Sequence, residues 1–125
     1  MLIFRFVKRY FGVFFVGSLS KVNYTESAKR DLRGIYEYIA NHFIEPETAA
    51  NLTRRIQDDI LNLDENPERY KVYDEEPWKS KELRHFPVDN FEIFYVVRED
   101  AVDVVRIMYG GMDISSQLRR TPELK

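Results

Sequence analysis

A chain of 125 residues, of which 44% are hydrophobic and 32% charged, has room for one compact domain but not for two. It contains no cysteine, which excludes disulfide bonds, thiolate metal sites and a cysteine nucleophile. The formal net charge of -2 argues against a general nucleic-acid binder, because such proteins carry a surplus of Lys and Arg. Acidic side chains follow helix faces without the spacing of a metal-binding loop, so we expect no metal and no cofactor.

The first 20 residues form a segment that is aromatic and basic. Its apolar stretch, Tyr10 to Gly17, is far shorter than the ~20 residues of a membrane-spanning helix, so no stable membrane span is expected. We interpret residues 1–20 as an extension ahead of a domain of residues 21–125, either disordered or an artefact of a start codon assigned too early. An amphipathic membrane contact and a cleaved signal peptide are the alternatives.

A short strand and a helix open the domain. Lys21–Tyr24 is predicted to be the strand. Apolar side chains from Ala28 to Phe43 then recur every three or four residues, and Thr25 precedes them as a candidate N-cap. This spacing predicts a helix from about Glu26 to His42.

A second amphipathic helix follows closely. Pro46 suits a first helical turn, and Glu47 suits the positively polarised N-terminal end. The apolar spacing continues from Ala49 to Leu63 and stops at Asn66-Pro67. The two helices should form a hairpin.

The period then changes from helical to alternating. Three segments rich in Val, Ile, Phe and Tyr, separated by turn residues, are Leu83–Val88, Phe91–Val97 and Val102–Met108. They predict a meander of three strands. The predicted fold is therefore α+β, in the order β-α-α-β-β-β, with the helical hairpin packed on one face of a small antiparallel sheet.

The order of the motifs resembles the RelE/ParE family of type II toxins. In the first half they are Tyr24-Thr25-x-x-Ala28-x-x-Asp31-Leu32; in the second they are Glu76-Pro77-Trp78, Leu83-Arg84 and Val105-Arg106-Ile107-Met108-Tyr109-Gly110-Gly111-x-Asp113. The resemblance covers roughly Lys21 to Leu118. It implies a small bacterial toxin of the cytoplasm, active in growth inhibition and plasmid stabilisation, whose groove is occupied by a cognate antitoxin protein.

Members of this family have two kinds of target. RelE-like members cleave mRNA in the ribosomal A site, whereas ParE-like members bind DNA gyrase and trap it. The first activity needs several cations and a proton donor around one phosphate, and the second needs only a binding surface. For a nuclease, the resemblance implies Arg84, Arg106 and Tyr109 as the catalytic residues.

Each of these three side chains also has a structural interpretation. Arg84 could bind a phosphate or pair with an antitoxin carboxylate. Arg106 lies within an apolar strand, so it must reach an open sheet face or pair with an acid such as Glu92 or Asp103. Tyr109 could donate a proton or form a hydrogen bond at the strand end.

Neighbouring positions favour a binding protein over a nuclease. Met112 stands where relatives usually carry arginine, and no tyrosine follows it in the next few residues. By strand alternation, His85 should face away from Arg84. Trp78 either anchors an interface or packs a loop on the core. We therefore favour a protein target such as DNA gyrase, and an mRNA interferase and a non-toxic, antitoxin-binding remnant are the alternatives.

Overall fold

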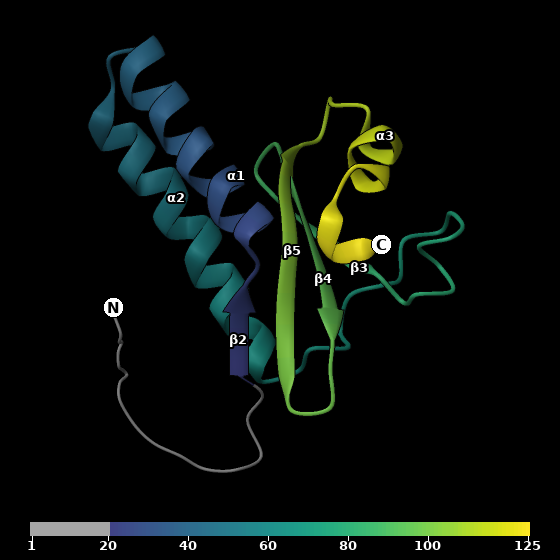
Figure 1. The fold of residues 1–125 in the computed structure, drawn as a ribbon. Coiled ribbons are helices and arrows are strands. Elements are labelled where there is room, and N and C mark those ends of the chain that lie inside the picture. The colour runs from purple at the N-terminus through teal and green to yellow at the C-terminus, as the bar shows by residue number, and fades with distance from the viewer. Residues whose placement is uncertain (1–20) are drawn as a thin grey trace.

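The computed structural model describes residues 21–125, so the predicted extension at residues 1–20 lies outside the described residues. The described strands and α-helices are, in chain order, β2 (Lys21–Tyr24), α1 (Glu26–Glu37), α2 (Pro46–Leu61), β3 (Arg84–Val88), β4 (Phe91–Val97), β5 (Ala101–Tyr109) and α3 (Ile114–Arg119). A π-helical turn at Tyr38–His42 extends α1, and 3-10 turns lie at Asn62–Asp64 and Pro122–Leu124. The predicted order β-α-α-β-β-β is confirmed, and α3 is added to it (Figure 1).

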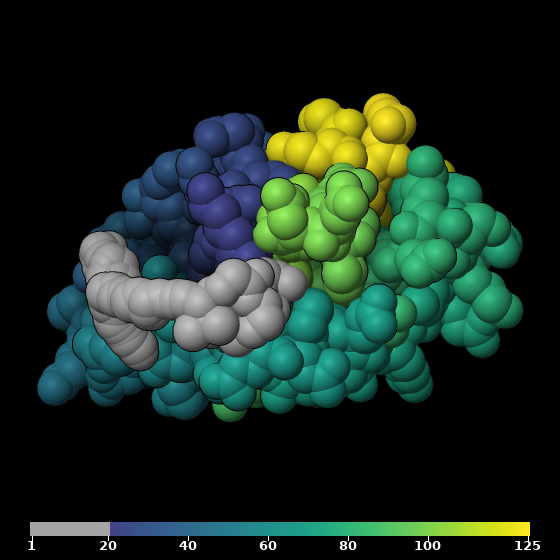
Figure 2. Space-filling view, turned by 90° about the horizontal axis from the view of Figure 1, so that it is seen from below, coloured from purple at the N-terminus to yellow at the C-terminus, as the bar shows by residue number. Residues whose placement is uncertain are grey.

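The four described strands form one sheet in the order β2-β5-β4-β3. β4 pairs antiparallel with both β3 and β5, as predicted for a meander. β2 instead runs parallel to β5, so the sheet is mixed, whereas an antiparallel sheet was expected. Parallel strands cannot be joined by a tight turn and need a long connection. The helical hairpin that follows β2 provides part of such a connection. Figure 2, seen from below, shows the β4–β5 turn beside β2.

Helices α1 and α2 cover one face of the sheet, as their apolar spacing predicts (Figure 1). Thr25 is the N-cap of α1, and its side chain accepts a hydrogen bond from the Ala28 N–H at 3.1 Å. The buried residues of this layer are Ala28, Leu52, Ile56, Ile60, Leu63, Phe86, Val88, Ile93, Tyr95, Val102, Val104 and Ile107. No helix among residues 21–125 is long and apolar enough to cross a membrane.

Tyr95 ties the sheet to the segment that follows α2. Its hydroxyl donates a hydrogen bond of 2.6 Å to the carbonyl of Pro67, the residue at which the helical pattern was expected to stop. Burial raises the pKa of Tyr95 to about 12, so the hydroxyl stays protonated and keeps this donor role across the neutral range.

The opposite face of the sheet is covered as well. Phe94, Val96, Val105 and Met108 point to this side and pack against residues of the loop before β3 and of the C-terminal segment, which we define as residues 113–125. Trp78 is only 4% exposed and belongs to this second core, which supports packing on the core over an interface anchor. A sheet buried on both sides leaves its central strands no open face.

Candidate functional site

Strand β5 extends beyond the short strand β2 and has an unpaired edge there. Backbone groups on such an edge need other partners, and α1 supplies them. The Thr25 hydroxyl donates to the Val105 carbonyl at 3.1 Å, and the Asp31 carboxylate accepts the Ile107 N–H at 2.9 Å. Side chains of α1 therefore continue the edge that β2 begins.

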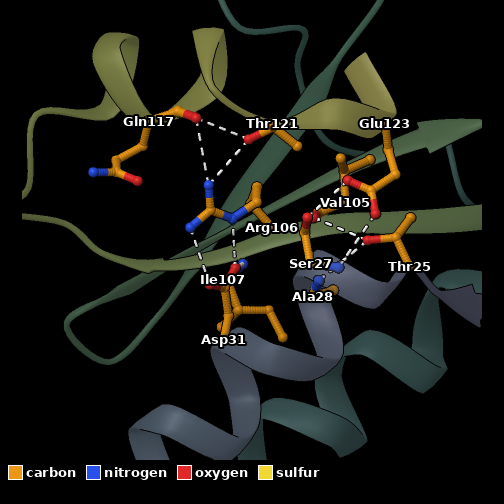
Figure 3. A network of polar contacts seen from close by, with 10 residues as sticks. All are labelled: Thr25, Ser27, Ala28, Asp31, Val105, Arg106, Ile107, Gln117, Thr121 and Glu123. Atoms are coloured by element: carbon orange, nitrogen blue, oxygen red, sulfur yellow. Dashed lines mark hydrogen bonds and ion pairs between the residues drawn. The ribbon is translucent and has the colours of Figure 1, made fainter. Parts of the chain in front are cut away.

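Arg106 is held at the same edge (Figure 3). Its Nε and Nη2 atoms donate to the Asp31 carboxylate at 2.7 and 3.0 Å, and Nη1 donates to the Thr121 hydroxyl at 3.0 Å. The two charged side chains are 13% and 15% exposed, so this ion pair is largely withdrawn from water. The guanidinium joins α1, β5 and the C-terminal segment.

The predicted pairing of Arg106 with an acid is therefore confirmed, but the predicted partners are wrong. The register between β4 and β5 shifts at Phe94/Tyr95, which leaves Val105 as the extra residue of a bulge. Such a bulge re-aims the side chains of its strand. Glu92 and Asp103, the expected partners, instead pair with His85 and Arg98.

A second polar tie joins α1 to the C-terminal segment. The Glu123 carboxylate accepts hydrogen bonds from the Ser27 hydroxyl at 2.7 Å and from the Ser27 N–H at 3.3 Å. Desolvation alone would raise the pKa of Glu123, but these bonds, together with its own backbone and the charge of Arg30, lower it overall. The carboxylate is thus stabilised in its charged form.

A groove with a volume of about 610 Å³ runs between α1 and β5, next to the Arg106 ion pair. Tyr38, Tyr109 and Met112 line it and are 56%, 54% and 41% exposed. Arg30 also lines it and has no ion-pair partner among residues 21–125. A Cβ on Gly111 would lie 2.6 Å from the Tyr109 ring and would clash with it, so glycine at this position allows the ring to lie on the groove wall. The groove is mostly apolar and carries one cation, Arg30, that forms no direct salt bridge among residues 21–125, although its charge acts on Glu123.

Arg84 lies in a different hollow, with a volume of about 330 Å³. Its Nη1 donates to the carbonyls of Tyr70 and Glu68 at 2.6 and 3.3 Å, so part of its donor capacity is used by the chain itself. The ionisable side chains that line this hollow are Glu68, Lys81, Glu82, Arg84 and Arg98. The two acids offset two of the three cations, and neither His nor Tyr is among the lining residues to donate a proton.

The three residues predicted for a nuclease are thus divided between two hollows. Arg106 and Tyr109 line the α1–β5 groove, whereas Arg84 lies in the smaller hollow. Neither of these two hollows combines three unpaired cations with a proton donor. Asp31 belongs to the family motif, but it was not predicted to be the partner of Arg106. The only sequence signal for this role is its position on the face of α1 that packs against β5.

His85 faces the opposite side of β3 from Arg84, as strand alternation predicts. Its Nδ1 lies 2.6 Å from the Glu92 carboxylate, and its ring stacks on Phe94 with the centroids 5.6 Å apart. The ring of Tyr73 meets it edge-on at 5.2 Å. This arrangement packs the imidazole against the second core. No group of three or more metal-binding side chains occurs among residues 21–125.

Comparison with known proteins agrees with this architecture. The model of the family described as "ParE toxin of type II toxin-antitoxin system, parDE" matches residues 22–114. Among solved structures, the chromosomal ParDE toxin–antitoxin system from P. aeruginosa is similar, with a TM-score of 0.62 and 20% identity over 74% of this chain and 97% of that chain. A mutant of the E. coli toxin RelE in the free state is also similar, with a TM-score of 0.55 and 12% identity over 82% of this chain and 97% of that chain. No curated protein sequence matches.

Proposed function

The chain belongs to the ParE family of type II toxin–antitoxin toxins, and from this premise we propose that it stops growth by binding a protein target such as DNA gyrase in the cytoplasm. The alternative activity in this fold, cleavage of mRNA, requires several cations and a proton donor at one phosphate. The observation that carries the proposal is the commitment of Arg106 to Asp31 and Thr121. A guanidinium held in this way is not free to neutralise a phosphate.

The position of Arg84 supports the same proposal. It lies in a separate hollow from Tyr109 and donates to two backbone carbonyls. Losing one charge-stabilising contact already costs about a hundredfold in rate in other enzymes, and here two would have to be recovered. Binding to a protein surface does not require any of these groups to converge.

We propose that the cognate antitoxin binds in the α1–β5 groove. Tyr38, Tyr109 and Met112 form apolar walls that would receive the apolar face of a helix. Arg30 provides an exposed positive charge at this groove for an acidic side chain of the antitoxin. The ParDE structure to which this chain is similar is itself described as a toxin–antitoxin system.

Two assays test the target. The chain is expressed from an inducible promoter in a bacterium without the antitoxin, and we expect colony counts to fall. Purified protein should then inhibit supercoiling by purified DNA gyrase, and the 5' ends of cellular mRNA should not change.

Each other outcome contradicts a part of the proposal. Codon-phased cleavage of mRNA in arrested cells would show an interferase, and unchanged growth with soluble protein present would show a non-toxic remnant. The matched control is an Arg84→Gln variant, since both assays should give the wild-type result if Arg84 has no catalytic role.

A further inference from the structure

The tip of the helical hairpin is an exposed cluster of large apolar side chains. Tyr38, Phe43 and Ile44 are 56%, 55% and 82% exposed, which is unusual for three large apolar groups so close in sequence. The Tyr38 and His42 rings are stacked with centroids 4.7 Å apart, and Phe43 meets both rings edge-on. We call Tyr38, His42, Phe43 and Ile44 the hairpin tip.

The backbone of the hairpin tip is irregular in two respects. Tyr38–His42 forms a π-helical turn, a conformation that is rare and is frequent at functional sites. Ile44 has a φ of 54°, which is strained for a β-branched residue. Burial of the Ile44 side chain does not offset the energetic cost of this backbone, because most of the side chain is exposed to water. The hairpin tip thus combines a strained backbone with an exposed apolar side chain.

The sequence around the hairpin tip is acidic. Residues 34–53 contain no Lys or Arg, and Glu37, Glu45 and Glu47 are all exposed. An apolar projection with an acidic border fits a partner that has an apolar pocket with a basic border. A second copy of this chain would bring like charges together in a symmetric tip-to-tip contact, which disfavours it as the partner.

We propose that the hairpin tip is the surface with which the toxin engages its target, a protein with an apolar pocket bordered by Lys and Arg side chains. This inference rests on the proposed function. A projection of this kind enters a pocket, whereas the α1–β5 groove receives a segment of the antitoxin. Tyr38 belongs to both surfaces, so an antitoxin in the groove would cover part of the hairpin tip and block the target.

The test compares a tip variant with a matched control. In the double variant Phe43→Gln and Ile44→Asn, apolar area is lost while Asn accommodates the positive φ at position 44. The control, Leu61→Gln, changes an apolar residue that is 45% exposed at the far end of α2. The readouts are inhibition of gyrase supercoiling, colony counts after induction, thermal unfolding, and co-purification with the protein encoded by the neighbouring reading frame.

We expect the tip variant to need about thirtyfold more protein for half-maximal gyrase inhibition and to restore colony formation. Its unfolding midpoint and its co-purification should match the wild type, and the control should match the wild type in every readout. If the tip variant inhibits gyrase as strongly as the wild type, the hairpin tip is not the target-binding surface. Loss of co-purification would also overturn the assignment, because it would show that the antitoxin binds the hairpin tip. If the wild-type chain itself leaves gyrase and growth unaffected, the proposed function fails, and with it the target on which the tip assignment rests.

Discussion

At the scale of single residues, Arg106 decides how the edge of the sheet is held. Replacing Arg106 with Ala would leave the Asp31 carboxylate largely buried without its cation, although the Ile107 N–H would still donate to it. Breaking a pair of this kind costs about 3 kcal/mol. We expect urea denaturation to show a loss of this size in the free energy of unfolding.

The control for this prediction is the exposed pair of Arg98 and Asp103. Arg98 is 54% exposed, so the Arg98→Ala variant should lose less than about 1 kcal/mol. Equal losses in the two variants would mean that Arg106 contributes no more than a surface charge, and that its guanidinium is available for other chemistry.

Glu123 makes a pH-dependent contribution. Its pKa is lowered below the ordinary value of 4.5, so its bonds to Ser27 stabilise the fold above that pH and are lost as the pH falls through the lowered pKa. The side chain is exposed, so the effect is less than about 1 kcal/mol. We expect the wild type to unfold at a higher temperature than Glu123→Gln at pH 7, and we expect this difference to shrink as the pH is lowered below 4.5. A constant difference at both pH values would contradict this origin.

The sequence could predict which residues carry charge near the site but not their partners. Arg106 was expected to pair with an acid because the residues next to it in sequence form an apolar strand. The choice of Asp31 depends on the bulge at Val105 and on the short length of β2, which leaves the edge of β5 open to α1. The bulge depends on strand register, which no local pattern of these segments specifies.

At the scale of elements, the helices and the strands were predictable because their apolar periods are strong. Phe91–Val97 and Lys21–Tyr24 agree with the structure at both ends. The six-residue helix α3 was missed, since it is too short for its period to be visible. Its signal was Asp113, whose side chain accepts the Ser116 N–H as an N-cap. The direction of β2 was not encoded locally, because a long crossover can join either parallel or antiparallel strands.

The C-terminal segment is expected to be essential for the fold. Truncation after Met112 would remove Leu118 and Leu124, which are 0% and 7% exposed, and would uncover the second face of the sheet. Burial of two such side chains contributes about 4 kcal/mol. We expect the truncated chain to bind a hydrophobic dye and to lose cooperative unfolding.

The control for the truncation is removal of Lys125 alone, which is exposed and should leave unfolding unchanged. If the truncated chain unfolds with the wild-type midpoint, the second core does not stabilise the sheet. The segment would then be a detachable cover over Phe94 and Met108.

At the scale of the whole molecule, the sheet separates the charged side chains instead of gathering them. The helical hairpin and the C-terminal segment cover its two faces, and the two hollows that contain the predicted residues lie at its margins. Arg84 lies at the margin formed by β3, and Tyr109 and Arg106 lie at the margin toward α1. The three groups therefore do not share one hollow.

This separation leads to a prediction for Met112, the position at which the family resemblance implies an arginine. Met112→Arg would add a second cation to the groove that contains Arg30 and Tyr109. We expect no cleavage of mRNA, because Arg106 would still be paired with Asp31 and Arg84 would still lie in the other hollow. Mapping of mRNA 5' ends after induction provides the measurement, with Met112→Gln as the uncharged control. Codon-phased ends that arise with the Arg variant alone would mean that one cation at position 112 is sufficient, and that the groove beside α1 can act as a nuclease site without Arg84.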